Sequence, residues 1–130
     1  MLTLEAAKTM VATAEAAAMR ENLRGVIAVV DDGGWPILIE RMDNAAYTAS
    51  VELAPAKARS AALFKKPSQA LEDTINQGST AAVTAHGFTE MTGGLPIVVD
   101  GQVIGAIGAS FDTPKHDIEI AQAGLAAVHP

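Results

Sequence analysis

The sequence predicts an α/β fold of the α+β type, in which helices pack on an antiparallel sheet. Two turn sequences carry this prediction, Asp-Asp-Gly-Gly at residues 31–34 and Asp-Gly-Gln at residues 100–102. Each turn separates two apolar segments rich in β-branched side chains, as in a β-hairpin. Segments with the periodicity of amphipathic helices stand near both ends of the chain. Because hairpins rather than crossover helices join the strands, neighbouring strands should run antiparallel.

The first third of the chain is expected to hold one helix and the first hairpin. Thr3 is a candidate N-cap, and the helix after it should run to about Glu21. The two strands are expected at residues 26–30 and 36–41.

The middle of the chain is expected to be helical. A helix is predicted over residues 48–64, and Pro55 leaves two alternatives for it. Either the regular helix begins near Ala54, with the proline in its first turn, or the helix is kinked at the proline. Ser68 should cap a short helix that ends near Asn76.

The second half of the chain is expected to hold the second hairpin and the best-marked helix. Residues 80–88 fit no single element. Strands are predicted at residues 95–99 and 103–108. The final helix should begin with Thr113 as its N-cap and Pro114 at its first position.

The composition limits the class of protein. The 130 residues fit one domain, which we expect to span residues 1–130, and 49% of them are hydrophobic, so a packed core is expected. The net charge of −6 argues against nucleic acid as a partner, because phosphate binding needs clustered basic residues. There is no cysteine, which excludes disulfides and thiolate chemistry. No membrane span or signal peptide is evident, and the cytoplasm is the expected compartment.

Glycines mark two positions of interest. Gly93 and Gly94 precede a strand and either turn their backbone N–H groups toward an anion or form a plain turn. Gly105 and Gly108 lie inside a predicted strand, so another element is expected to pack close against it.

The chain has three histidines, of which His86 and His116 are candidate ligands for a metal or for haem iron. His116 is expected in the first turn of the last helix, exposed and neutral. His86 stands beside apolar residues, where a lone histidine is more often structural. His129 is expected to fray at the end of the chain. No pair has the spacing of a zinc site.

Several segments together resemble the GlcG/HbpS-like family, also called the haem-degrading domain family. They cover nearly the whole chain: residues 26–34, 41–43 (Arg-Met-Asp), 57–64 (KARSAALF), 93–97 (GGLPI), 101–108 (GQVIGAIG) and 113–124 (TPKHDIEIAQAG).

The resemblance implies a five-stranded antiparallel sheet flanked by helices, of profilin- or PAS-like shape. It also implies homo-oligomers, commonly octamers. Some members of the family bind haem, others accompany enzymes of glycolate or aromatic-compound catabolism, and one branch forms part of a cobalamin adenosyltransferase. The chain departs from the family pattern at Phe111-Asp112, where glycines are usual, and at Pro55. The first departure is expected to reshape a pocket beside the last helix.

Two functions follow from the residues and the resemblance together. In the first, the protein binds a small ligand such as haem or another tetrapyrrole in an apolar groove that includes Phe88 and Phe111. Basic side chains would pair the haem propionates, and a histidine would reach the iron. The candidates are Lys57, Arg59 or Arg41 for the propionates, and His86 or His116 for the iron.

In the second, the protein is an enzyme of the isomerase or hydratase kind that acts on a small carboxylic acid. Arg41 and Lys57 would clamp the acid, and His86 or Glu90 would move a proton.

In both functions, the polar residues of the motifs border one pocket, and that pocket binds a small molecule. The expected set is Arg41, Asp43, Lys57, Glu90, Gly93 and Gly94, together with Phe111. The alternative is that Arg41 and Asp43 form a surface ion pair and that Lys57 is a solvated helix residue.

Overall fold

The elements follow the predicted order in the computed structural model, which describes residues 1–128. His129 therefore lies outside the described residues. The order is α1 (Leu4–Arg20), β1 (Val26–Asp31), β2 (Pro36–Arg41), α2 (Ser50–Phe64), α3 (Ser68–Asn76), the 3-10 helix η1 (Thr80–Thr84), β3 (Gly94–Val99), β4 (Gln102–Ser110) and α4 (Pro114–Ala126).

The sheet has four strands in the order β2-β1-β4-β3, and every neighbouring pair is antiparallel. The predicted antiparallel hairpins are thus confirmed, but the five strands implied by the family resemblance are wrong for the described residues. The described chain has four strand-forming segments. The ambiguous segment forms η1 and a loop, because its backbone makes local turn hydrogen bonds instead of pairing with an edge strand.

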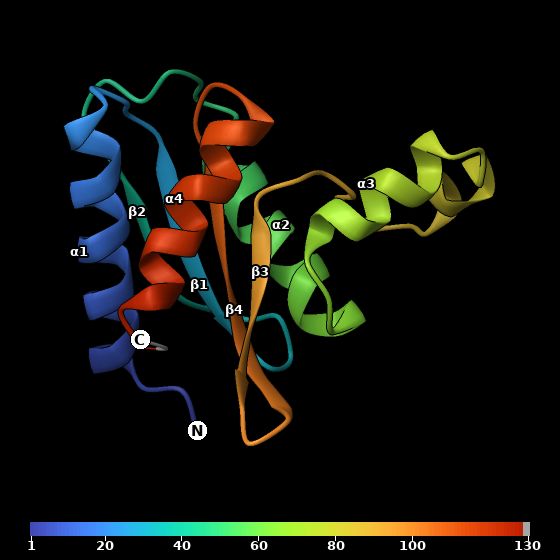
Figure 1. Ribbon diagram of the computed structural model, residues 1–130, viewed down its shortest axis with the longest axis horizontal. Helices are drawn as coiled ribbons and strands as arrows, with labels where there is room; N and C mark the ends of the chain where they lie inside the picture. Colours follow the sequence, from blue (N-terminus) through green and yellow to red (C-terminus); the bar gives the residue numbers. More distant parts are fainter. Residues whose placement is uncertain (129–130) are drawn as a thin grey trace.

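Helices cover both faces of the sheet (Figure 1). Helices α1 and α4 pack side by side on one face, α2 covers the other face, and α3 with η1 extends away from the sheet. Strand β1 contributes side chains to the core on each face of the sheet, because successive side chains of a strand point to opposite faces. Ile27 and Val29 pack toward α1 and α4, whereas Val30 packs against the alanines of α2.

Small residues let α2 approach the sheet closely. A Cβ atom at Gly108 would overlap the carbonyl oxygen of Ala54, so β4 needs a glycine where α2 crosses it. This confirms the expectation of close packing against that strand. Helix α2 begins at Ser50 and contains Pro55 in its interior. The alternative in which regular helix begins near Ala54 is therefore wrong.

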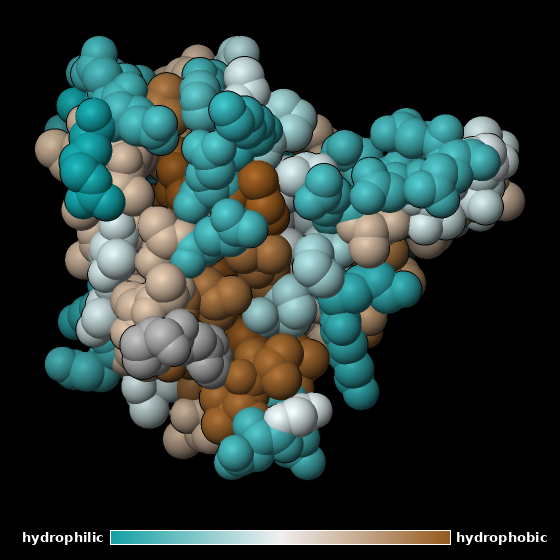
Figure 2. Space-filling view, in the orientation of Figure 1, coloured by the Kyte–Doolittle hydropathy of each residue, from teal (hydrophilic) through white to brown (hydrophobic). Residues whose placement is uncertain are grey.

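The end helices begin where their caps were predicted. The Thr3 hydroxyl accepts a hydrogen bond from the backbone N–H of Ala6 at 3.1 Å, and the Thr113 hydroxyl accepts one from His116 at 3.2 Å. No helix within residues 1–128 combines the length and the hydropathy needed to cross a membrane. Figure 2 shows polar residues over most of the visible surface, with hydrophobic surface concentrated over the β3–β4 hairpin.

Candidate functional site

A buried ion pair joins three elements at the end of the sheet where β4 finishes. Lys57 of α2 is 2% exposed, and its Nζ lies 2.9 Å from Oδ2 of Asp117 in α4. The same ammonium donates to the carbonyl oxygen of Ala109 at 3.2 Å. Asp117 Oδ1 accepts the backbone N–H of Phe111 at 2.6 Å. The pair therefore fixes the positions of α2 and α4 relative to the last residues of β4.

Two glycines make room for this lysine. Gly93 has a φ of +135°, and a Cβ there would clash with the Ala109 carbonyl and with the Lys57 side chain. A Cβ at Gly94 would overlap the Lys57 backbone. The N–H of Gly94 already donates to the Ser68 hydroxyl at 2.8 Å. The structure thus assigns these glycines to close packing over Lys57 and gives the Gly94 N–H a partner within the chain.

A cavity of about 140 Å³ opens beside the pair. Lys57 and Asp117 line it together with Phe111, Tyr47, Glu72 and Thr92. Its charged lining is mostly acidic, because Glu72, Asp112 and Asp117 face a single ammonium. The backbone N–H of Thr92 donates to Glu72 Oε1 at 3.0 Å, which links α3 to the loop before β3.

Burial controls the ionisation of Asp117. Removal from water raises the pKa of its carboxyl, although Lys57 and the Phe111 N–H favour the charged form. Desolvation is therefore the stronger influence at this carboxyl.

A second pair stands at the rim of the cavity. Asp112 lines the cavity, and its Oδ1 lies 2.7 Å from Nδ1 of His116, which is in the first turn of α4. The hydrogen bond to Asp112 raises the pKa of His116. Slight desolvation opposes ionisation of Asp112, but the His116 bond and charge lower its pKa overall. A carboxylate on Nδ1 leaves Nε2 as the free nitrogen, which is the usual arrangement of a histidine that ligates a metal. The sequence predicts a neutral histidine here, but the bond to Asp112 raises the pKa of His116 and so favours its charged form.

The structure divides the predicted site residues between separate places. Lys57 and Phe111 line one cavity, and Gly93 packs on Lys57. Arg41 and Asp43 are exposed and border two other hollows near the end of β2. The strand alternation turns Arg41 toward solvent at the sheet edge, two strands away from β4.

The remaining two candidates lie outside the Lys57 cavity. Glu90 is half-buried in the loop before β3, and His86 is exposed beyond η1. A clamp on a small acid by Arg41 and Lys57 is therefore not assembled, and the ammonium of Lys57 already has a carboxylate partner. The picture of Lys57 as a solvated helix residue is also wrong, because the side chain is buried.

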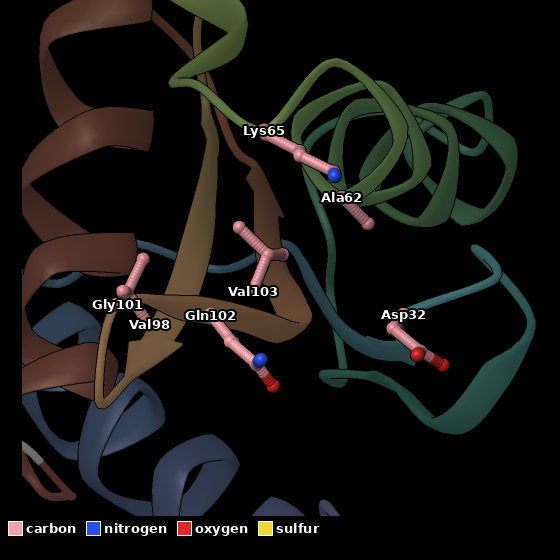
Figure 3. Close-up of a pocket in the computed structure, with 7 residues that line it drawn as sticks. All are labelled: Asp32, Ala62, Lys65, Val98, Gly101, Gln102 and Val103. Carbon is pink, nitrogen blue, oxygen red and sulfur yellow. The ribbon is translucent and has the colours of Figure 1, made fainter.

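A larger hollow of about 500 Å³ lies between the two hairpin turns and the end of α2 (Figure 3). The side chains of Asp32, Lys65 and Gln102 reach it from separate elements and lie apart from one another. No hydrogen bond or ion pair links these three in the described part of the chain. The cavity beside Lys57 is the better site, because its charged groups are buried and held by hydrogen bonds.

Sequence reasoning did not place Asp117, Thr92, Glu72 or Tyr47 in the site. Helical periodicity contains a signal for Asp117, which precedes the buried Ala121 and Gly124 by four and seven residues and so shares their face. A carboxylate on a buried helix face needs a partner. Nothing local in the sequence identifies that partner as Lys57.

Within residues 1–128, no cluster of three or more histidine, aspartate or glutamate side chains could hold a metal ion alone.

Comparison with known proteins identifies the family. The family model described as "Haem degrading protein HbpS-like" matches residues 2–126. The chain belongs to this family. Protein GlcG of Escherichia coli strain K12 is 41% identical over 110 residues, which cover 85% of this chain and 81% of GlcG.

Two solved structures of HbpS-like relatives have the same fold. The Klebsiella pneumoniae protein ORFY superposes with a TM-score of 0.90 at 33% identity, covering 98% of this chain and 90% of ORFY. A complex of PduOC with haem superposes with a TM-score of 0.88 at 28% identity, covering 97% of this chain and 94% of PduOC. The predicted family relationship is confirmed.

Proposed function

We propose that this HbpS-like protein binds haem or a related tetrapyrrole, with His116 as the ligand to the metal. The single observation that carries the choice of residue is the 2.7 Å contact between His116 Nδ1 and Asp112. That contact orients the ring and reserves Nε2 for coordination. The description of the family and the haem complex of PduOC support the choice of ligand.

The small size of the Lys57 cavity supports a surface position for the tetrapyrrole. Sites for ligands of drug size usually enclose roughly 300–1,000 Å³, whereas this cavity has about 140 Å³. The macrocycle would lie over the rim, where Tyr47 is 55% exposed and Met91 is 43% exposed. These two exposed side chains form an apolar surface, against which the macrocycle could pack, beside a polar cavity.

The residues at the rim of the cavity fit a haem group. Bound haem would supply an iron centre that can take an imidazole ligand. The chain's own part is to hold that imidazole through Asp112 and to shield one face of the macrocycle with Tyr47 and Met91.

Titration with hemin, followed by the Soret absorbance, tests the proposal. We expect His116→Ala to abolish the Soret shift of the wild-type complex, and Asp112→Ala to weaken haem affinity by about tenfold or more. His86→Ala is the matched control, because His86 is the other candidate and lies outside the rim.

A loss of the Soret shift in His86→Ala but not in His116→Ala would assign the iron to His86 and overturn the choice of ligand. A wild-type protein that gives no saturable Soret change would overturn haem binding itself.

A further inference from the structure

The cavity beside Lys57 has the size and chemistry of a second binding site. We infer that it binds a small uncharged molecule that carries two or three hydroxyl groups. This site adjoins the tetrapyrrole position proposed at the rim and shares Tyr47, Met91 and Asp112 with it, but its volume of about 140 Å³ is too small for a macrocycle.

The volume limits the ligand to a few heavy atoms. About 140 Å³ corresponds to roughly five water molecules at their share of liquid volume, about 30 Å³ each. A two- or three-carbon diol or triol fills such a space, whereas a sugar ring or an aromatic acid exceeds it.

A buried hydroxyl in the cavity has no partner in the described chain. Thr92 is 4% exposed and lines the cavity. Its backbone N–H is bonded to Glu72, but within residues 1–128 its side-chain hydroxyl makes no hydrogen bond. Buried polar groups are nearly always satisfied, so this hydroxyl indicates a water or a ligand in the cavity.

Lys57 offers a donor to the same space. Its ammonium has three N–H groups, and contacts within the described chain use two of them, with Asp117 Oδ2 and the Ala109 carbonyl. The third can donate to a ligand oxygen. Glu72 engages one oxygen with Thr92 N–H, which leaves the other to accept from a ligand hydroxyl. Each ligand hydroxyl can both donate and accept, so it complements this mixed set.

The charges of the lining favour a neutral ligand over a carboxylate. Three carboxyl groups, those of Glu72, Asp112 and Asp117, border the cavity, and Lys57 already neutralises one of them. A bound anion would share that single ammonium and would face Glu72 without compensation. Burying an unpaired charge is far more costly than burying a hydrogen-bonded hydroxyl.

The test compares ethane-1,2-diol and propane-1,2-diol with glycolate, which has the same two-carbon skeleton as the first diol but is an anion. Amide chemical shifts of Thr92 and Phe111 would be followed by ¹H–¹⁵N NMR. Melting temperature is unsuitable, because polyols stabilise proteins generally by exclusion from their surface. We expect both diols to give saturable shifts and glycolate to give none in the same concentration range.

Thr92→Val should weaken diol affinity by about fivefold to tenfold, because it removes one buried hydrogen bond and keeps the shape. Thr74→Val is the matched control, since Thr74 is exposed on α3 and its hydroxyl bonds to the Ala70 carbonyl. Glu72→Gln adds a test of the charge argument, because it should improve glycolate affinity relative to the diols.

Three results would overturn the inference. They are tighter binding of glycolate than of the diols by the wild type, unchanged diol affinity in folded Thr92→Val, and no saturable shift with either diol. The last result would show that the cavity holds only water. A negative Soret titration would leave this site unaffected, so the two proposals fail separately.

Discussion

At the scale of single residues, a carboxyl pair between α1 and β2 gives the protein a pH-dependent feature. Glu40 lies opposite Ile27 in the β1–β2 ladder, so it points to the face that α1 covers. Glu15 of α1 meets it there. Desolvation, together with the hydrogen bond and the charge of Glu40, raises the pKa of Glu15 to about 7.

We predict that this pair makes the fold less stable as the pH rises from about 4.5 to about 7. Over that range the folded state holds a proton on Glu15 that the unfolded state has lost, so ionisation favours unfolding. Glu15→Gln should therefore increase the free energy of unfolding at pH 8 by about 1 kcal/mol, a value discounted for partial exposure of the pair.

Urea unfolding at pH 5 and pH 8 would measure this effect. The gain at pH 5 should be much smaller than the gain at pH 8. Glu52→Gln, on the exposed side of α2, is a matched control that should leave the pH profile as in the wild type. Equal effects of Glu15→Gln at both pH values would contradict the assignment.

At the scale of elements, the Lys57–Asp117 pair ties α2 to α4 through the end of β4. We predict that Lys57→Met and Asp117→Asn each lower the free energy of unfolding by about 3 kcal/mol or more, because each leaves one buried polar or charged group unpaired. The double variant removes both charges together and should lose less than the sum of the two single losses. Urea unfolding of the four proteins completes the thermodynamic cycle.

Coupling of about 1 kcal/mol or more in that cycle is the expected sign of direct interaction. Strictly additive losses would mean that the two side chains act independently and that the ion pair does not join the elements. Lys115→Met, at an exposed lysine of α4, should have little effect on stability and controls for the loss of a lysine.

The same pair shows how far the sequence predicts the structure. Turns and caps are local, so residues 31–34, Thr3 and Thr113 could be interpreted from their neighbours alone. Helical periodicity likewise contains a signal that Asp117 lies on a buried face, but the sequence left Lys57 as either a pocket residue or a solvated one. The two residues are 60 positions apart, however, and only the folded sheet brings them within 2.9 Å.

The other predicted site residues show that local sequence does not determine which side chains share a cavity. Arg41 and Asp43 resembled a functional strand end, but local charge says nothing about which hollow a strand end borders. The structure places them at the β2 edge, near different cavities from Lys57. The family pattern drew attention to Lys57 and Phe111, which line one cavity, while the place of Thr92 and Glu72 beside them depends on long-range packing.

At the scale of the whole molecule, the sheet has two unpaired edges with apolar side chains. β2 is one edge strand, where Ile39 is exposed, and Trp35 is exposed in the turn immediately before it. β3 is the other, and Val98 and Val99 are exposed near the hydrophobic surface over the β3–β4 hairpin (Figure 2). Open strand edges and apolar patches of this kind favour association of chains. We propose that the protein forms homo-oligomers larger than a dimer, as the family resemblance implied.

Two separate edges allow a sharper prediction than oligomerisation alone. A closed dimer needs one self-complementary interface per chain, whereas a closed assembly of dimers needs a second one. If both edges are interfaces, the pair Trp35→Lys and Ile39→Lys should leave dimers joined through β3. The pair Val98→Lys and Val99→Lys should leave dimers joined through β2, and all four changes together should give monomers.

Multi-angle light scattering at micromolar concentration measures each mass, and Val83→Lys, at an exposed apolar residue of η1, is the control. A monomeric wild type would refute the assembly, and an unchanged mass in either double variant would remove that edge from the interface.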